Sequence, residues 1–369
     1  MTVGSISERN DSTRRFIFEL CRTYPRLELP DIYKALYQSA FGCEHLLSDP
    51  SAAADYIKEE AMRSCELDGA STDRLIEPLD GDYCRVYLEY LSHGLTAETF
   101  ARLFVMSAER QSDATWRFSE KLHVLALMAE AGEIPFSAAE LSEYIAEKKQ
   151  AGYPPCHHSD KYRTEYKPAY RLMKREFAAY LPLFARMDEL LAVHANDSHT
   201  ILVSIDGGSA TGKSTLAELI ERVYNCPIFH MDDFFLRPEQ RTAERYAEPG
   251  GNVDRERFLV EVLEPIRRGI AVSYRRFDCS TLALKPPVSI TPGRLCVIEG
   301  AYSMHKDLSP YYDLSVFLKI DSKTQRERII KRNGDYAQTF FDKWIPLEMK
   351  YFDKMEPEKR CDIVIENSF

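Results

Sequence analysis

The stretch Asp206-Gly207-Gly208-Ser209-Ala210-Thr211-Gly212-Lys213-Ser214 decides the fold of the second half of this chain. Residues 200–205, which precede it, favour a strand, and residues 215–222, which follow, favour a helix. Gly-x-x-x-x-Gly-Lys-Ser between a strand and a helix is the P-loop pattern, in which backbone N–H groups face phosphate oxygens. The lysine would reach the β- and γ-phosphates, and the serine hydroxyl would bind Mg²⁺. The sequence therefore predicts a nucleoside triphosphate site made by Gly207, Gly208, Ser209, Ala210, Thr211, Gly212, Lys213, Ser214 and Thr215.

Apolar, strand-like runs alternate with helical runs through the rest of this half. The strand-like runs are residues 201–205, 227–230, 295–298, 314–320 and 363–365, and the helical runs are residues 215–223, 254–268 and 322–332. Strands without polar alternation, separated by helices, are typical of a parallel sheet covered on both faces. We therefore predict an α/β domain of the P-loop NTPase type over residues 198–369, with the nucleotide at the carboxyl ends of the strands.

The first half has a different pattern. Residues 1–195 read as helices joined by short polar breaks, and strand-like alternation is nearly absent apart from residues 86–88. A short polar link, residues 194–198, separates the two patterns. We expect an all-helical N-terminal domain over residues 1–195.

Composition excludes several classes of protein. The 369 residues fit two domains, and the formal charge of −10 argues against a nucleic-acid surface, which would be basic. The nine cysteines are odd in number and never form a C-x-x-C pair, which favours reduced thiols. No apolar run approaches the ~20 residues that span a bilayer, and the first ten residues are polar. We expect a cytoplasmic protein that binds neither membrane nor nucleic acid; whether it forms a homo-oligomer stays open.

Two acidic segments lie where a phosphoryl-transfer site needs them. Asp232 and Asp233 follow the second predicted strand, where a carboxylate can take a proton from an acceptor hydroxyl or hold Mg²⁺ through water. Glu299 ends the third strand, as the Walker-B carboxylate does when it positions Mg²⁺. The alternatives are an acidic loop or helix cap for the first segment, and a chance apolar run ending in Glu for the second.

A basic helix is the third such element. Arg328 and Arg332 are four residues apart in the predicted helix 322–332 and so share one face. Two guanidinium groups closing over the phosphates would stabilise charge in the transition state. The alternative is a solvated basic face.

Together these segments resemble the uridine kinase/phosphoribulokinase family of P-loop kinases, over about residues 198–369. The stretches that carry the resemblance are the P-loop, Met231-Asp232-Asp233-Phe234-Phe235, Arg276-Phe277-Asp278, Glu299-Gly300, and Phe317-Leu318-Lys319-Ile320-Asp321 running into Arg328 and Arg332. The resemblance implies that Asp232 is the general base, that Ser214 and Glu299, with Asp232, are Mg²⁺ ligands, and that Arg328 and Arg332 are lid arginines. It also places the acceptor against Asp233, Tyr274, Arg276, Phe277 and Asp278.

The chain departs from this family at two places. Uridine kinases carry a histidine that reads the pyrimidine shortly after the segment that Arg276-Phe277-Asp278 resembles, whereas residues 279–282 here contain none. The double arginine of the family's lid is Arg328-Ile329 in this chain, and the arginine-rich lid loop is replaced by residues 333–336. The resemblance therefore supports kinase chemistry more firmly than a pyrimidine acceptor.

Histidines mark two segments of the helical half. His45 follows Glu44 in one segment, and His157 and His158 lie in the other, which continues into a stretch rich in Tyr and Arg up to Arg171. These histidines would form a metal or anion site only if the fold brought them together, since no local ligand spacing is present. The alternatives are packing between helices and a polar small-molecule pocket over residues 153–171. The role of this half stays open.

The sequence thus predicts an ATP- and Mg²⁺-dependent kinase that transfers the γ-phosphate to a hydroxyl of a nucleoside, sugar or related small metabolite. The alternative is a non-catalytic ATP-binding module that signals nucleotide occupancy to the helical domain. Asp232 discriminates between them, because a nucleotide switch needs no base for an acceptor. The acceptor and the preference for ATP over GTP stay open.

Overall fold

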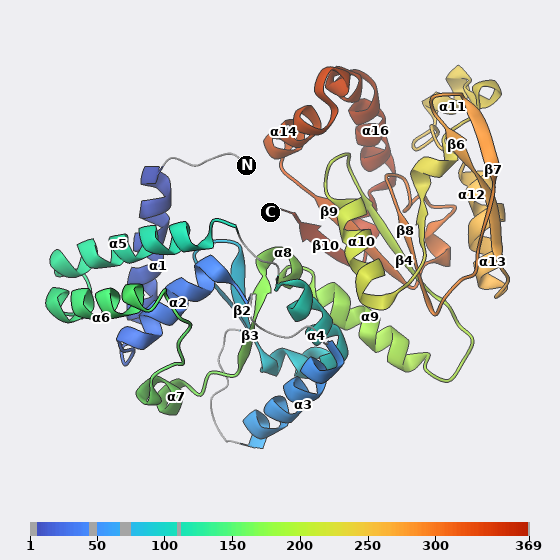
Figure 1. Cartoon of the computed structure of the whole chain (residues 1–369). Coiled ribbons are helices and arrows are strands. Elements are labelled where there is room, and N and C mark those ends of the chain that lie inside the picture. The colour runs from blue at the N-terminus through green and yellow to red at the C-terminus, as the bar shows by residue number, and fades with distance from the viewer. Residues whose placement is uncertain (1–5, 44–49, 67–74, 109–111, 368–369) are drawn as a thin grey trace. The chain divides into compact units, whose positions relative to one another are not determined.

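A computed structural model describes residues 6–43, 50–66, 75–108 and 112–367. The chain forms two compact units, residues 1–185 and residues 186–369, and each is described by itself. Figure 1 shows that helices predominate in the first and that a sheet forms the centre of the second. No helix of the described ranges has both the length and the apolar composition needed to cross a membrane.

Helices make up most of the N-terminal unit. They are α1 (Ile6–Thr23), α2 (Leu29–Phe41), α3 (Pro50–Glu66), η1 (Leu88–His93), α4 (Ala97–Met106), α5 (Ala114–Glu130), α6 (Ala138–Gln150), α7 (Asp160–Tyr166) and α8 (Arg175–Ala178), and α9 (Leu181–Val193) runs through the point at which the two units divide. One core cluster joins Ile32 and Leu36 of α2 to Phe118 and Leu125 of α5, and all four side chains are completely buried. This packing of apolar helix faces stabilises the unit.

The N-terminal unit also contains a small sheet, so the expectation of an all-helical domain was wrong in this respect. Strands β1 (Ile76–Pro78), β2 (Tyr83–Tyr87) and β3 (Tyr170–Lys174) pair antiparallel in the order β1-β2-β3. Every residue of β2 is buried, including Arg85 at its centre. A strand buried on both faces shows no alternation of polar and apolar residues, and for that reason the strand-like pattern at residues 86–88 marked only the end of β2.

The C-terminal unit is built on a five-stranded parallel sheet, and this α/β fold confirms the prediction. The strands are β4 (Ile201–Gly207), β5 (Ile228–His230), β8 (Leu295–Glu299), β9 (Leu314–Lys319) and β10 (Ile363–Glu366). Their order is β10-β9-β4-β8-β5, so the P-loop strand β4 lies in the middle (Figure 1). All seven residues of β4 are buried, as expected for a central strand covered on both faces.

The register of this sheet brings three chain segments to one edge. Glu299 pairs with Ile205 of β4 on one side and with His230 of β5 on the other. Because these strands are parallel, the residues that follow each of them emerge side by side. The P-loop, the segment that begins at Met231 and the end of β8 therefore meet at the carboxyl edge.

Helical segments connect the strands of this sheet. They are α10 (Lys213–Tyr224), η2 (Met231–Phe234), η3 (Pro238–Gln240), α11 (Ala243–Ala247), α12 (Arg255–Phe258), η4 (Leu259–Leu263), α13 (Glu264–Arg267), η5 (Ser309–Tyr311), α14 (Ser322–Asn333), η6 (Gly334–Tyr336), α15 (Ala337–Thr339), η7 (Phe340–Trp344), α16 (Ile345–Met355) and α17 (Pro357–Arg360). The predicted helix 254–268 is interrupted, because η4 is a π-helical turn. Pro265 follows this turn and has no N–H to donate, which accounts for the change in hydrogen bonding.

A two-stranded antiparallel ribbon was not predicted. Strands β6 (Val272–Asp278) and β7 (Ala283–Ile290) pair with each other alone, with an irregularity between Arg275 and Phe277. Pro286 and Pro287 lie inside β7 and argue against a strand in the sequence. A proline has no backbone N–H to donate to a neighbouring strand. The ribbon tolerates the two prolines because β7 has no second neighbouring strand that would need such a donor.

Candidate active site

The P-loop links β4 to α10 through a tight turn. The backbone has positive φ at Gly207 (144°), Ala210 (62°) and Gly212 (97°). A Cβ on Gly207 would clash with the carbonyl oxygen of Leu318, and one on Gly212 would meet the side-chain amide of Asn367 in a backbone conformation that other residues rarely adopt. Glycine is therefore required at both positions, as the motif predicts.

Asp206 anchors the base of this loop and was not recognised as a site residue from the sequence. Its buried carboxylate accepts hydrogen bonds from the backbone N–H of Gly207 (2.6 Å), Tyr302 (3.2 Å) and Met304 (2.9 Å) and from the hydroxyl of Tyr351 (2.7 Å). Burial raises the pKa of Asp206, and these donors oppose the rise. The four bonds tie the loop to the segment after β8 and to α16.

The start of α10 presents the side chains that would face a nucleotide. Lys213 donates from Nζ to the carbonyl oxygen of Gly208, at 2.8 Å. The Ser214 hydroxyl lies 3.4 Å from both carboxylate oxygens of Glu299, and Nδ1 of His230 lies 2.6 Å from Oε1 of the same carboxylate. The hydrogen bond to Glu299 raises the pKa of His230 above its usual 6.5, against the effect of burial. Ser214 and Thr215 are exposed and Lys213 is half-buried, so a ligand can reach all three.

The two aspartates of η2 have different surroundings. Asp233 accepts from the hydroxyl of Tyr274 (3.0 Å) and pairs with Nε of Arg276 (3.3 Å). Asp232 is exposed, and no residue in the described ranges donates a hydrogen bond to it. Desolvation by the surrounding protein raises the pKa of Asp232; Lys213 opposes that rise and Glu299 adds to it. Of the pair, Asp232 alone offers a carboxylate that is not already engaged.

The ribbon β6–β7 carries the residues expected to face an acceptor. Tyr274 and Phe277 are buried, whereas Arg276 and Asp278 have exposed or half-exposed side chains. Ser280 donates to Asp278 from its N–H (2.8 Å) and its hydroxyl (2.6 Å), which holds the pKa of Asp278 at about 2. The structure thus brings Tyr274 and Arg276 to Asp233, while Asp278 is bound within its own turn.

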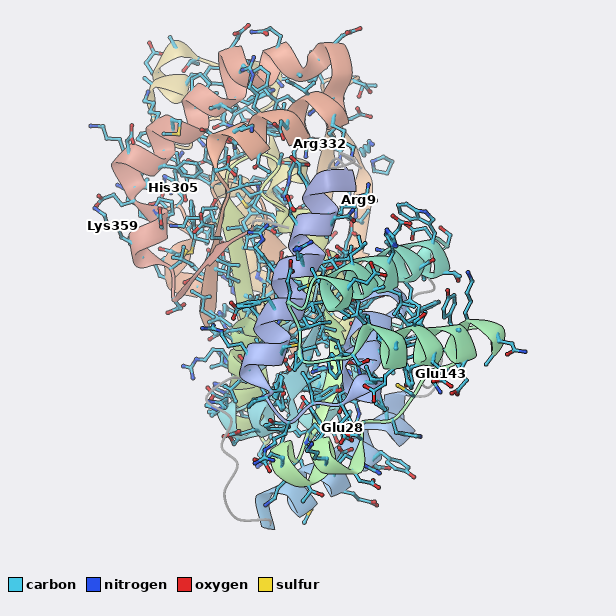
Figure 2. The ribbon with its side chains drawn as sticks, turned by 90° about the vertical axis from the view of Figure 1, so that its left-hand side faces the viewer. Arg9, Glu28, Glu143, His305, Arg332 and Lys359 are labelled. Atoms are coloured by element: carbon cyan, nitrogen blue, oxygen red, sulfur yellow. The ribbon has the colours of Figure 1, made fainter. Side chains whose placement is uncertain are left out.

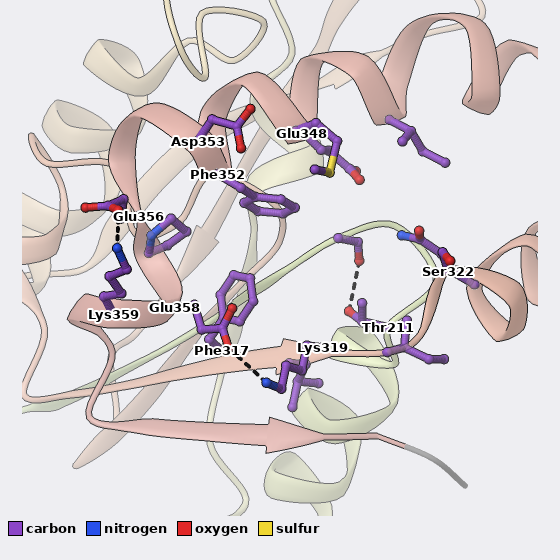
Figure 3. Close-up of a pocket in the computed structure, with 17 residues that line it drawn as sticks. Thr211, Phe317, Lys319, Ser322, Glu348, Phe352, Asp353, Glu356, Glu358 and Lys359 are labelled. Atoms are coloured by element: carbon purple, nitrogen blue, oxygen red, sulfur yellow. Dashed lines mark hydrogen bonds and ion pairs between the residues drawn. The ribbon is translucent and has the colours of Figure 1, made fainter.

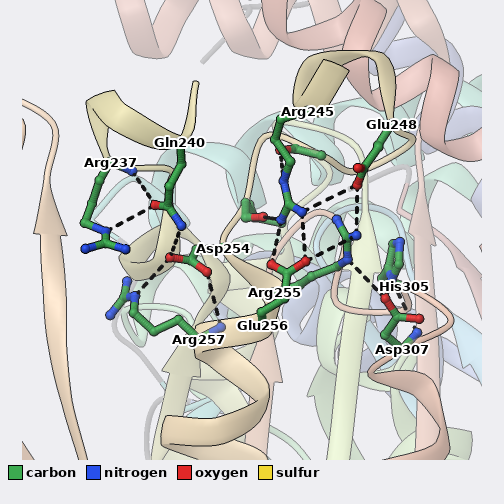
Figure 4. A network of polar contacts seen from close by, with 12 residues as sticks. Arg237, Gln240, Arg245, Glu248, Asp254, Arg255, Glu256, Arg257, His305 and Asp307 are labelled. Carbon is green, nitrogen blue, oxygen red and sulfur yellow. Dashed lines mark hydrogen bonds and ion pairs between the residues drawn. The ribbon is translucent and has the colours of Figure 1, made fainter. Parts of the chain in front are cut away.

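A polar network that no sequence pattern indicated holds the segment after Asp233 (Figure 4). Arg257 donates to the carbonyl oxygens of Asp233 (3.1 Å) and Arg275 (2.7 Å), and its guanidinium lies 4.1 Å from the ring centroid of Phe234. It therefore ties η2 to the ribbon. Around it, Asp254 accepts from Gln240 (2.8 Å) and caps α12, as the figure shows.

The two predicted lid arginines have different partners. Nη1 of Arg328 lies 3.5 Å from the carbonyl oxygen of Ala210, at the P-loop. Arg332 is exposed (Figure 2), and its guanidinium lies over the ring of Phe340, 5.5 Å from the centroid. Only Arg328 of this pair contacts the P-loop.

The donor set near Ser214 suits a hard cation. A hydroxyl and a carboxylate at the start of a P-loop helix are oxygen ligands of the kind that Mg²⁺ prefers. The described ranges contain no group of three or more His, Cys, Asp or Glu side chains arranged to hold a metal ion. A cation here would thus take its remaining ligands from phosphates and water, as Mg²⁺ does in nucleotide sites.

The histidines of the N-terminal unit do not share one environment. His45 lies outside the described residues, and His157 is exposed. His158 is buried, with Nδ1 2.9 Å from Asp31 and Nε2 2.6 Å from the Tyr170 hydroxyl, and burial lowers its pKa to about 4. Its ring also stacks on Tyr162, with the centroids 4.2 Å apart. In this segment, His158 and the tyrosines are engaged in packing and mutual hydrogen bonds.

Comparison with known proteins gives distant relatives. No protein-family model matches the chain. It is 23% identical over 184 residues to a uridine kinase of Brevibacillus brevis, which covers 45% of this chain and 84% of that protein. It is 23% identical over 181 residues to a phosphoribulokinase of Synechocystis, covering 45% of this chain and 53% of that one. It is also 23% identical over 180 residues to the mouse uridine-cytidine kinase-like 1, covering 42% of this chain and 33% of that one.

The chain is distantly similar to uridine kinases and phosphoribulokinases over about half its length. It thus spans only a third to about half of two of these three relatives. The predicted resemblance is confirmed at this level.

Solved structures give similarly distant matches. A possible uridine kinase from Bacillus stearothermophilus has a TM-score of 0.38 and 22% identity, covering 50% of this chain and 98% of that one. A D-glycerate 3-kinase from Cryptococcus neoformans has a TM-score of 0.33 and 14% identity, covering 46% of this chain and 83% of that one.

Proposed function

We propose that this protein is an ATP- and Mg²⁺-dependent kinase that phosphorylates a hydroxyl group of a small metabolite. The observation that carries the proposal is the carboxylate of Asp232, which is exposed and accepts no hydrogen bond from the described residues. Lys213, Glu299 and His230 all lie within electrostatic range of it. A module that only binds nucleotide has no need of an unengaged carboxylate with a raised pKa at this position.

Each group has a role in this proposal. The P-loop N–H groups and Lys213 bind the β- and γ-phosphates, and Arg328 extends from α14 to the same loop. Ser214 and Glu299 would hold Mg²⁺, which neutralises phosphate charge when bound. Asp232 accepts the proton of the acceptor hydroxyl as its oxygen attacks the γ-phosphorus atom, and ADP leaves. Asp233, fixed by Tyr274 and Arg276, shapes the acceptor side.

We do not expect the site to select a pyrimidine nucleoside as its acceptor. The turn of the ribbon, residues 279–282, holds no histidine, so one reader of the base edge is missing. A site that hydrogen-bonds a base edge rejects analogues strongly, because its buried polar groups would be left unpaired. We therefore expect weak discrimination between uridine and other ribosides, or a preferred acceptor of another class.

The test is an ATP-consumption screen with uridine, cytidine, ribose and inositol-type polyols, with the Asp232→Asn protein as the blank. Turnover with any acceptor that the blank lacks supports the kinase. A kcat/KM for uridine above about 10⁴ M⁻¹s⁻¹, with all other acceptors far behind, would contradict the expected specificity. ATP binding without turnover across a broad set of hydroxylated metabolites would favour the nucleotide-binding module instead.

Mg²⁺ binding is expected to depend on pH through His230. Below its raised pKa, protonated His230 holds Glu299 and competes with the cation for that carboxylate. As the pH rises through this pKa, which lies above the usual 6.5, His230 loses its proton and frees Glu299, so the affinity for Mg²⁺ in the presence of ATP should increase.

The phosphates of ATP also titrate in this range, so the measurement is the ratio of wild-type to His230→Gln Mg²⁺ affinity at each pH. The ratio should rise towards alkaline pH. A ratio that does not change with pH would show that His230 has no effect on the cation.

A further inference from the structure

Ser209, the third residue of the P-loop, is held at every polar group by α14 and α16. Its N–H donates to Oε2 of Glu348 (2.9 Å), and its hydroxyl donates to Oε1 of the same carboxylate (2.6 Å). Its carbonyl oxygen accepts from Nε2 of Gln325, at 2.9 Å. Figure 3 shows Glu348 on α16, across the cavity from the strand β9. The Glu348 carboxylate thus accepts a hydrogen bond from a backbone N–H of the P-loop, and in the proposed function the N–H groups of this loop bind phosphate.

Glu348 is an unusual residue to find beside an anion site. It is only 4% exposed, and no lysine or arginine in the described ranges forms an ion pair with it. Burial raises the pKa of Glu348, and Lys213 of α10 opposes that rise. Asp206 at the end of β4 also faces it and adds to the rise, and Tyr302 after β8 lies within electrostatic range.

A cavity of about 490 Å³ is lined in part by the Glu348 side chain (Figure 3). It is lined by P-loop atoms of Gly208 and Thr211, by apolar side chains such as Phe317 and Phe352, and by acidic residues of α16 and α17. Two lysines of the lining are already paired, Lys319 with Glu358 and Lys359 with Glu356. The cavity gives the Glu348 carboxylate room to withdraw from the loop, but no unpaired cation to receive it.

We propose that Glu348 is a built-in anionic competitor that binds the P-loop at Ser209 and weakens nucleotide binding until it withdraws or takes up a proton. The proposal rests on the proposed function, because it concerns the polyphosphate site. Two anions cannot share one partly buried nest of N–H groups without strong repulsion. The chain therefore sets its affinity for nucleotide through a residue that lies 139 positions from the loop.

The experiment compares the binding of MgATP to the wild-type protein and to Glu348→Gln by calorimetry. Glutamine keeps an acceptor for the Ser209 N–H and removes only the charge. We expect the Kd of Glu348→Gln to be lower by about tenfold. Asp353→Asn is the matched control, since Asp353 is an exposed acid on the same helix and lines the same cavity without contacting Ser209. Its Kd should equal that of the wild type.

Measurements over a range of pH distinguish a Glu348 that competes with phosphate from one that only holds the P-loop in place. The affinity of the wild type for MgATP should improve relative to that of Glu348→Gln as the pH falls, because a protonated Glu348 no longer repels phosphate. The other titrating groups, including Asp206, Asp232 and His230, are common to both proteins, so their effect cancels in the comparison. Equal Kd values, or weaker binding by Glu348→Gln with an unchanged Tm, overturn the proposal and make Glu348 a structural brace.

The outcomes also distinguish the two proposals. Binding by both proteins with the same Kd overturns only the competitor, whereas no binding by either overturns the proposed function along with it. If Glu348→Gln does not fold, Ser209→Ala removes the hydroxyl bond to Glu348 and should lower the Kd in the same direction by a smaller factor. An unchanged or higher Kd for Ser209→Ala would then overturn the competitor.

Discussion

Replacing Asp232 by asparagine is expected to lower turnover by roughly 10²–10⁴-fold while ATP still binds. The amide cannot accept the proton of the acceptor hydroxyl, and the phosphate site formed by Lys213 and the P-loop is left intact. Because no described residue donates a hydrogen bond to Asp232, the change breaks no contact that holds the fold. Steady-state kinetics with the acceptor found by the screen, together with the ATP-induced rise in Tm, measure both parts of the prediction.

Asp233→Asn is the control for this experiment. Its carboxylate is held by Tyr274 and Arg276, so the substitution should disturb the acceptor side and lower turnover by less than Asp232→Asn does. Small and equal losses from both substitutions would show that the two acids only shape the loop.

Lys213→Ala should abolish the rise in Tm that ATP produces, and turnover with it. The ammonium group is the one P-loop cation expected at the β- and γ-phosphates, and its loss removes that contact. Without nucleotide the lysine makes one hydrogen bond to the Gly208 carbonyl and is only half-buried, so the Tm of the free protein should change little.

Thermal unfolding with and without MgATP tests this prediction. Arg332→Ala provides a comparison, because Arg332 contacts Phe340 rather than the P-loop. It should retain most of the ATP-induced rise. If Lys213→Ala retains the full rise, the nucleotide does not bind at this loop.

The parallel sheet and the convergence of its strand ends could be predicted from the sequence for a physical reason. Buried parallel strands are continuous apolar runs, and the P-loop identifies the first of them. Once the strands are parallel, Asp232 and Glu299 must emerge at the edge where the P-loop begins, and the register of Glu299 with Ile205 and His230 agrees.

What the sequence could not reveal depends on contacts between distant segments. Glu348 is an ordinary acidic residue on an amphipathic helix until α16 brings it to Ser209. Arg257 likewise acquires its role only when it reaches the carbonyl oxygens of Asp233 and Arg275. The pairing of β6 was not predicted because its partner β7 contains prolines. Only the end of β2 was indicated, because both faces of that strand are buried and its residues do not alternate.

The pairing of β8 with β4 and β5 also limits where residues can be inserted or deleted during evolution. Successive residues of a strand point to opposite faces, so one residue inserted or deleted within Leu295–Glu299 would turn Glu299 away from Ser214. The turn of the ribbon at residues 279–282 is exposed and takes no part in the sheet. Insertions and deletions in homologous chains should therefore accumulate in that turn and be absent from the strands that end at the P-loop edge.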